Sequence, residues 1–305
     1  MRTAIDLAFL HDHAERKIYS EIIVSSDGEK IFLQRNFPKS SRLLNQVNHI
    51  IMVHELSFYH ERFAKLVDGL IRKMSGEVAF TLIDLRGHGL STGHRGVVNS
   101  FDDYVEDLLL VINHGPDFGN SVVKTSLLGE GGAGLIVLKT ILEERKRMNN
   151  LISGAILINP LIKPRSFIIK NNLRDFFKRN NWDQKLRMKN IFNSDVKSTN
   201  QNDYNKILLD PLNQNFMTSK MLSELLLCSE EVRFLSYYID MPTLTILSED
   251  DKITDSEAGH LFAKGIDSKF REIVCYHEEG HNLIWGKKRD SVVANICQWL
   301  RRENV

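Results

Sequence analysis

The sequence has few cysteines, no excess of either charge and no long apolar run. Its three cysteines, Cys228, Cys275 and Cys297, are odd in number and widely spaced, which indicates neither a disulfide framework nor a metal site. With 40 basic and 39 acidic residues, the chain has no electrostatic basis for binding nucleic acid or an anionic membrane. No apolar stretch approaches the ~20 residues that a membrane span requires, so we expect no integral membrane segment.

Residues 1–19 also lack the features of a signal peptide. They contain Asp6, Asp12 and Glu15 and no long apolar core. The hydrophobic content of 42% and the charged content of 26% are ordinary for a globular protein in solution. Together with the few cysteines, these features predict a protein of the reducing cytoplasm.

Short apolar runs alternate with helical periodicity through most of the chain. Residues 17–37 form two alternating runs around Asp27-Gly28, a dipeptide typical of a hairpin turn. Six predicted strands end near His54, Asp84, Gly129, Asn159, Ser248 and Tyr276. The continuous apolar runs at 49–54 and 78–85 are typical of strands buried on both faces. Helical spacing follows near residues 58–74, 101–112, 135–142, 256–266 and 291–300. This alternation predicts an α/β fold with a mostly parallel central sheet and helices on both faces.

Residues 161–240 interrupt the alternation. They are rich in Asn, Lys, Arg and aromatic residues, and no buried strand is evident among them. We interpret them as a mostly helical insertion packed on one end of the sheet, with residues 1–160 and 241–305 forming the core. The alternative is a poorly ordered linker, but ~80 structureless residues inside a compact domain would be unusual.

The segment 124–134 predicts a strand, a very tight turn and a helix. Leu127 and Leu128 lead into Gly129, and four of the next five residues are Gly or Ala. Such a turn needs small residues, because the backbone enters positive-φ regions and the helix packs close to the strand.

Candidate catalytic residues follow the predicted strand ends, where doubly wound sheets place their sites. Glu55 follows one strand, Gly131 lies in the tight turn, and Asp251 and His281 follow two later strands. An esterase of this architecture uses Ser, then Asp or Glu, then His, and Asp251 and His281 come after the turn in that order. In such a site the His is the general base and the Asp fixes its tautomer.

Four stretches carry a resemblance to a known family: Asp84-Leu85-Arg86-Gly87-His88-Gly89-Leu90-Ser91 and residues 101–108, 248–255 and 280–282. On these stretches the chain resembles the monoacylglycerol lipase and lysophospholipase group of α/β-hydrolases, also called serine aminopeptidase-like. The resemblance covers about residues 49–300 and implies the α/β-hydrolase fold.

The resemblance also implies roles for particular residues. It places Asp251 and His281 as members of a catalytic triad, and an oxyanion hole at Glu55 and Gly132. It makes residues 161–240 a lid over an acyl-binding pocket. The implied ligand is a small apolar or acyl-containing molecule.

Two departures from the family pattern lie at positions where the family has catalytic residues. The family turn resembles Gly-His-Ser-Met-Gly-Gly, and here Gly131 stands where the nucleophilic serine belongs. The oxyanion segment usually begins His-Gly, and here it is His54-Glu55. Glycine adopts the strained turn conformation with little penalty, so the turn is kept while the hydroxyl is lost. Glu130 precedes the nucleophile position and is not expected to face a pocket.

Two of these assignments have competitors. Asp250 and Asp255 flank Asp251, and the same acidic loop could be solvated or bind a cation weakly. Residues 129–134 formally match a dinucleotide fingerprint, but the match is not on the first strand and lacks a suitable acidic residue about 20 positions on. We therefore expect no cofactor.

Three functional hypotheses remain. The first is a family member that has lost hydrolysis and binds an apolar ligand or a protein partner. The second is a carboxylic-ester hydrolase in which Gly131 is an isolated replacement, natural or introduced. The third is a lyase that uses His281 as its base. The altered oxyanion segment favours the first, because an isolated replacement would change only the nucleophile.

Overall fold

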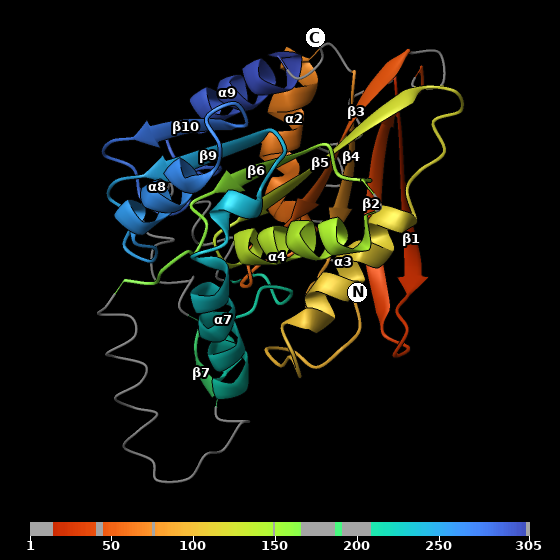
Figure 1. Ribbon diagram of the computed structural model, residues 1–305. Coiled ribbons are helices and arrows are strands. Elements are labelled where there is room, and N and C mark those ends of the chain that lie inside the picture. The colour runs from red at the N-terminus through yellow and green to blue at the C-terminus, as the bar shows by residue number, and fades with distance from the viewer. Residues whose placement is uncertain are drawn as a thin grey trace, which may run out of the picture.

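The computed structural model describes residues 15–40, 45–74, 77–148, 150–165, 187–190 and 209–302. Its centre is an eight-stranded sheet with the order β1-β2-β4-β3-β5-β6-β9-β10 (Figure 1). The strands are β1 Arg16–Val24, β2 Lys30–Pro38, β3 Gln46–Val53, β4 Val78–Ile83, β5 Val122–Glu130, β6 Gly154–Ile158, β9 Thr243–Ser248 and β10 Arg271–Tyr276. Neighbours from β4 to β10 run parallel, and β2 is antiparallel to both β1 and β4. The predicted mostly parallel sheet is confirmed.

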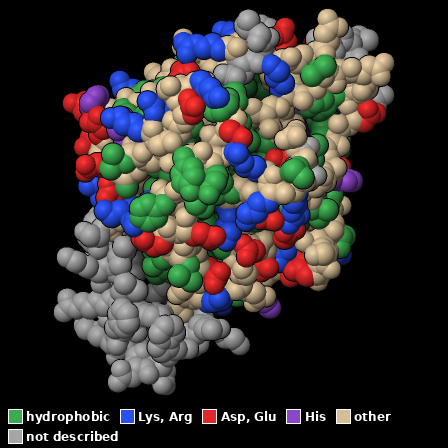
Figure 2. Space-filling view, viewed as in Figure 1, with side chains coloured by type: hydrophobic (Ala, Val, Ile, Leu, Met, Phe, Trp, Pro, Cys, Tyr) green, Lys and Arg blue, Asp and Glu red, His purple; other side chains and the backbone are tan. Residues whose placement is uncertain are grey.

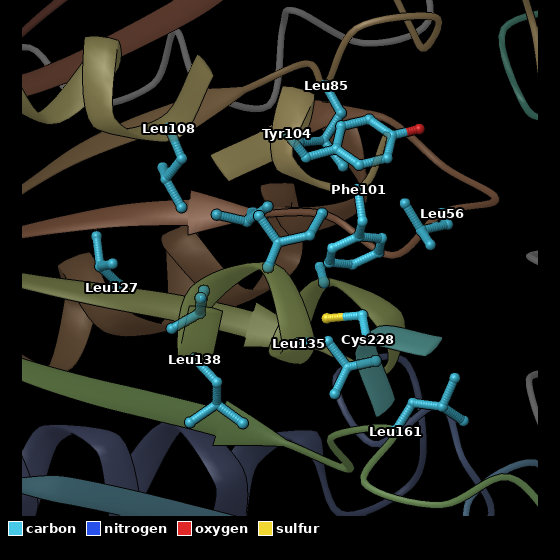
Figure 3. Close-up of a cluster of buried hydrophobic side chains, with 14 of the residues drawn as sticks. Leu56, Leu85, Phe101, Tyr104, Leu108, Leu127, Leu135, Leu138, Leu161 and Cys228 are labelled. Atoms are coloured by element: carbon cyan, nitrogen blue, oxygen red, sulfur yellow. The ribbon is translucent and has the colours of Figure 1, made fainter. Parts of the chain in front are cut away.

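Helices cover both faces of the sheet (Figure 1). They are α2 Ala64–Lys73, α3 Asp102–Asn113, α4 Gly132–Arg147, α7 Ser219–Val232, α8 Ser256–Gly265 and α9 Arg289–Arg302, with short 3₁₀ helices η2 His60–Phe63 and η4 Ser236–Tyr238. On one face α2 and α9 share a buried apolar cluster with the sheet, and on the other α3, α4, α7 and α8 share a second. Figure 3 shows part of the second cluster, with Leu127 of β5, Tyr104 and Leu108 of α3, and Leu135 and Leu138 of α4. The predicted two-sided arrangement is therefore confirmed.

The turn from β5 into α4 requires small residues at three positions. Gly131 has φ 55° and ψ −119°, a conformation that glycine adopts without a steric penalty. A Cβ on Gly129 would lie 2.7 Å from the Ala133 carbonyl oxygen, and one on Gly134 would lie 2.9 Å from Pro160 Cβ. The tight strand–turn–helix predicted from the sequence is present, with its closest approaches at these glycines.

The described part of the insertion comprises residues 161–165, 187–190 and 209–240. It contains α7, η4 and a two-stranded antiparallel ribbon of β7 Arg187–Lys189 and β8 Phe216–Thr218, which the sequence did not predict. These strands are three residues each, too short to produce an alternating pattern. The rest of the predicted lid lies outside the described residues, so the lid stays a prediction. No helix within the described ranges is long and apolar enough to cross a membrane.

Candidate active site

The carboxyl ends of four strands bring the predicted site residues together. Glu55 follows β3, Gly131 follows β5, Asp251 follows β9 and His281 follows β10. Each of the four is buried, and Glu55 and His281 have no exposed surface. The parallel strands align these ends at one edge of the sheet, which is where the alternating sequence pattern placed the site.

Asp251 and His281 form the predicted contact. His281 Nδ1 donates to Asp251 Oδ2 at 2.7 Å. Asp251 Oδ1 also accepts from the backbone N–H of Ile253 at 2.7 Å and of Thr254 at 2.9 Å, and Oδ2 accepts from Thr254 Oγ1 at 2.6 Å. Burial raises the pKa of Asp251, but His281 and Thr254 outweigh burial and hold that pKa below its usual range. The predicted distance is confirmed, while a catalytic role for the pair stays a prediction.

The two competing aspartates lie elsewhere. Asp250 is exposed at the surface of the loop. Asp255 caps α8, because its Oδ1 accepts from the backbone N–H of Ala258 at 3.2 Å, and it pairs with Lys163 at 3.1 Å. Within the described ranges, no group of three His, Cys, Asp or Glu side chains could hold a metal ion.

The Glu55 side chain points into the centre of the site. Its Oε1 accepts from Leu56 N at 2.7 Å and from Gly132 N at 3.2 Å. Its Oε2 accepts from Gly132 N at 3.0 Å and lies 3.3 Å from His281 Nε2. We call these three donors, Leu56 N, Gly132 N and His281 Nε2, the carboxylate cradle. Its two backbone donors are arranged like the oxyanion hole of an α/β-hydrolase, which combines the N–H after the nucleophile with one from the loop after β3.

The Glu55 carboxylate also occupies the space that a side chain at position 131 would need. A Cβ built on Gly131 would overlap Glu55 Oε2, lie 2.7 Å from Glu55 Cδ and lie 2.9 Å from His281 Nε2. A serine at 131 and the observed position of Glu55 are therefore mutually exclusive. The two departures from the family pattern are coupled: the side chain lost at 131 leaves the room that the side chain at 55 fills.

The His281 ring lies between two carboxylates. Burial alone would lower its pKa, but Asp251 and Glu55 together raise the pKa of His281 well above its usual range. The pKa of Glu55 is also raised above its usual range, because burial outweighs the opposing hydrogen bond and charge of His281. Because both ring nitrogens face carboxylate oxygens, the arrangement is that of an imidazolium donating to both.

A second buried ion pair lies beside the turn. Arg62 donates to Glu130 through Nε at 2.6 Å and through Nη2 at 2.8 Å, and Nη2 also donates to Asn282 Oδ1 at 2.6 Å. Glu130 thus faces η2 and not the cradle, as the sequence analysis expected. The pair links the turn after β5 to the residue that follows His281.

His54 and His88 shape the loop that carries Glu55. His54 Nδ1 donates to the Glu55 carbonyl at 2.9 Å, and His54 Nε2 accepts from Leu85 N at 3.0 Å. Burial lowers the pKa of His54 to about 3, so this ring stays neutral. His88 lies with its ring nitrogens near the carbonyls of Arg86 and Leu56, at 2.9 and 3.2 Å.

Comparison with known proteins shows the family of the chain. A model of the family described as serine aminopeptidase, S33 matches residues 45–287. The chain belongs to this α/β-hydrolase family.

Its relatives include proteins of several lengths. An uncharacterized abhydrolase domain-containing protein of Dictyostelium discoideum is 24% identical over 284 residues, which are 92% of this chain and 28% of that protein. A phospholipase of Bacillus subtilis is 30% identical over 113 residues, covering 37% of this chain and 40% of its own length. The chain thus spans less than half the length of these two. A monoglyceride lipase homolog of Monkeypox virus is 25% identical, covering 70% of this chain and 76% of its own length.

Solved structures of the same fold include two lipases. The monoacylglycerol lipase of Paleococcus ferrophilus has a TM-score of 0.69 and 19% identity, covering 94% of this chain and 99% of its own. A soluble variant of the Saccharomyces cerevisiae monoglyceride lipase, in complex with a substrate analog, has a TM-score of 0.73 and 17% identity over 94% and 96% of the two chains. At such low sequence identity, the structural similarity to these two lipases shows the fold alone.

A surface cavity of about 720 Å³ lies away from the strand ends, between α3, α4, α7 and η4. Val105, Leu142 and Tyr238 line it together with charged residues such as Lys139, which pairs with Asp102 at 2.8 Å. Figure 2 shows hydrophobic and charged side chains intermixed on the face that includes α4. The site residues do not line this cavity, so the acyl pocket implied by the family resemblance stays a prediction.

Sequence reasoning missed two features of the site. It assigned Glu55 to the oxyanion hole without placing the carboxylate, and the structure puts that carboxylate on the hole's donors. It also did not name Leu56, whose N–H is the donor on the loop after β3. A signal was available, because a gained carboxylate and a lost serine fell at two positions that the family fold brings together.

Proposed function

We propose that the chain is a non-hydrolytic member of the monoglyceride lipase-like α/β-hydrolases, in which the His281–Asp251 pair binds the Glu55 carboxylate. The observation that carries this proposal is the carboxylate's position. It makes hydrogen bonds with both backbone donors of the cradle and fills the space of the missing nucleophile. An ester carbonyl has no donor left to stabilise its developing negative charge, a contribution that is usually the largest in such enzymes.

The same geometry argues against an isolated replacement of the serine. Restoring a side chain at Gly131 alone would force Glu55 out of the cradle, since the two occupy one space. A sequence with a single lost nucleophile would not also carry the carboxylate that fills the gap.

A lyase that uses His281 as its base is also disfavoured. A general base must be unprotonated near the working pH. Here Asp251 and Glu55 raise the pKa of His281 well above its usual range, so the ring holds its proton at neutral pH.

We propose further that the ligand of this protein is an apolar or acyl-containing molecule. Two of the structural neighbours are described as monoacylglycerol or monoglyceride lipases, one of them bound to a substrate analog. The described residues 187–190 and 209–240 would form part of a lid over the site. The few free cysteines, of which only Cys275 is exposed, agree with a reducing cytoplasm.

Ester hydrolysis and labelling by a fluorophosphonate probe test the loss of hydrolysis. The wild-type protein should be inactive with p-nitrophenyl butyrate and unlabelled, because it lacks the nucleophile. Gly131→Ser should be labelled far more weakly than the double variant below, because the displaced Glu55 carboxylate must still be accommodated beside the new side chain. Loss of the nucleophile alone costs on the order of 10⁶-fold in turnover. Gly131→Ser combined with Glu55→Gly should be labelled, and adding His281→Ala to that pair should abolish labelling.

The decisive contrary result would come from the unmodified protein. Ester turnover by the wild type that disappears in His281→Ala would mean that another residue is the nucleophile and that the chain is an active hydrolase.

A further inference from the structure

The carboxylate cradle holds the carboxyl group of Glu55 in this chain, and its donors explain why. Two are backbone N–H groups, Leu56 N at 2.7 Å and Gly132 N at 3.0–3.2 Å from the Glu55 oxygens, and the third is the His281 ring at 3.3 Å. Gly132 also begins the 16-residue helix α4, whose N-terminus favours negative charge. A planar group with two oxygens and one negative charge satisfies all three donors at once.

We infer that the carboxylate cradle is a binding site for aliphatic carboxylic acids, in which the Glu55 side chain is a resident internal ligand. This inference rests on the proposed function, because a serine at position 131 would fill the same space. Beyond its Cα, the Glu55 side chain has the composition of propionate. A propionate ion therefore reproduces the group that the cradle holds.

The surrounding charges fit a single exchangeable carboxylate. Asp251 faces the other nitrogen of the His281 ring at 2.7 Å and accounts for the imidazolium charge. Glu130 lies nearby but is paired with Arg62 through two hydrogen bonds, so this pair adds no net charge. Removing Glu55 leaves an imidazolium with one carboxylate partner and two backbone donors with none, which is an anion site.

The absence of a side chain at Gly131 supplies the space. A Cβ there would overlap the position of Glu55 Oε2, so only glycine leaves room for a carboxylate above the turn. The substitution Gly131→Ala should therefore block the site, because its methyl group would occupy the position of a carboxylate oxygen.

The insertion holds the loop that carries Glu55. Asn190 Nδ2 donates to the Leu56 carbonyl at 2.9 Å, and Gln214 N donates to the Ser57 carbonyl at 2.8 Å. Tyr59 OH donates to Asp210 Oδ2 at 2.6 Å. Exchange of Glu55 for an external acid requires this loop to move against these contacts, so the wild type should bind carboxylic acids weakly.

Calorimetric titration with propionate tests the inference. Glu55→Gly should bind one propionate, and propionamide, which has the same shape without the charge, should not bind. The wild type should bind propionate at least about tenfold more weakly, since an attached carboxylate competes at an effective concentration in the millimolar range or above. Glu55→Gln, whose amide fills the cradle, should show no binding.

Two further measurements complete the test: propionate binding by a variant with Gly131→Ala, and the folding of Glu55→Gly with and without propionate. Glu55→Gly combined with Gly131→Ala should lose propionate binding; equal binding by both variants would place the ion elsewhere and overturn the inference. If Glu55→Gly is unfolded in buffer, propionate but not propionamide should restore a cooperative unfolding transition. A Glu55→Gly protein that neither binds propionate nor is refolded by it defeats the inference alone, whereas fluorophosphonate labelling of the wild type defeats the proposed function alone.

Discussion

Gly131→Ser should destabilise the protein strongly, and removing the Glu55 side chain as well should add little further loss, because both changes remove the same contacts. Residue 131 has a φ of 55°, where side chains other than hydrogen are strained. Its Cβ would overlap Glu55 Oε2 and lie 2.7 Å from Glu55 Cδ, well inside the roughly 3.5 Å at which carbon atoms meet comfortably. The carboxylate must therefore leave the cradle.

The size of the effect follows from two contributions. The backbone strain costs roughly 1–3 kcal/mol. Each hydrogen bond to a charged group contributes about 1.5–3 kcal/mol, and the carboxylate of Glu55 gives up such bonds with Leu56, Gly132 and His281. We expect a loss of at least about 4 kcal/mol, a large share of the roughly 5–15 kcal/mol that holds a typical domain together.

Urea denaturation of the wild type, both single variants and the double variant measures this coupling. The combined loss should be smaller than the sum of the two single losses by at least about 2 kcal/mol, within the range found for residues in contact. Gly28→Ser is the matched control, because Gly28 has a φ of 91° with no atom within 4 Å of its built Cβ. It should lose only about 1–2 kcal/mol. Additive losses at Glu55 and Gly131, or equal losses at Gly28 and Gly131, would refute the shared-space argument.

Two further predictions concern the buried charges. The folded-state pKa of His281 is raised above its unfolded value, so its stabilisation is fully present below about pH 6.5 and is lost as the pH rises through the folded pKa. The stability advantage of wild type over His281→Asn should therefore shrink from pH 6.5 upward, and an advantage independent of pH would contradict the raised pKa. Arg62→Met should cost about 3–5 kcal/mol in urea denaturation because it strands Glu130 without its cation; Glu130→Gln in the same chain should recover much of that loss, and no recovery would show that the ion pair is not its cause.

The amino-acid sequence determined the secondary structure of the central sheet and its helices, and placed the site residues at the strand ends. The apolar run ending near His54 marked β3 because strands buried on both faces carry such short continuous runs. The run ending at Tyr276 marked β10, which is a half-exposed strand at the edge of the sheet. The glycines at 129–134 marked the tight turn because a Cβ on Gly129 would collide with the Ala133 carbonyl oxygen and Gly131 has a positive φ. Asp251 and His281 could be paired because both follow parallel strands, whose carboxyl ends meet at one edge.

Only the tertiary structure decided what the site contains. Glu55 and Gly132 are 77 positions apart, and they meet because β3 and β5 are neighbours with Val53 opposite Gly129. The direction of the Glu55 side chain depends on donors from three separate segments, so no local pattern in the sequence encodes it. In the sequence, the missing serine at position 131 and the missing glycine at position 55 are two separate departures from the family pattern. The tertiary structure links them, because the space at the end of β5 can hold either a side chain at position 131 or the Glu55 carboxylate, but not both.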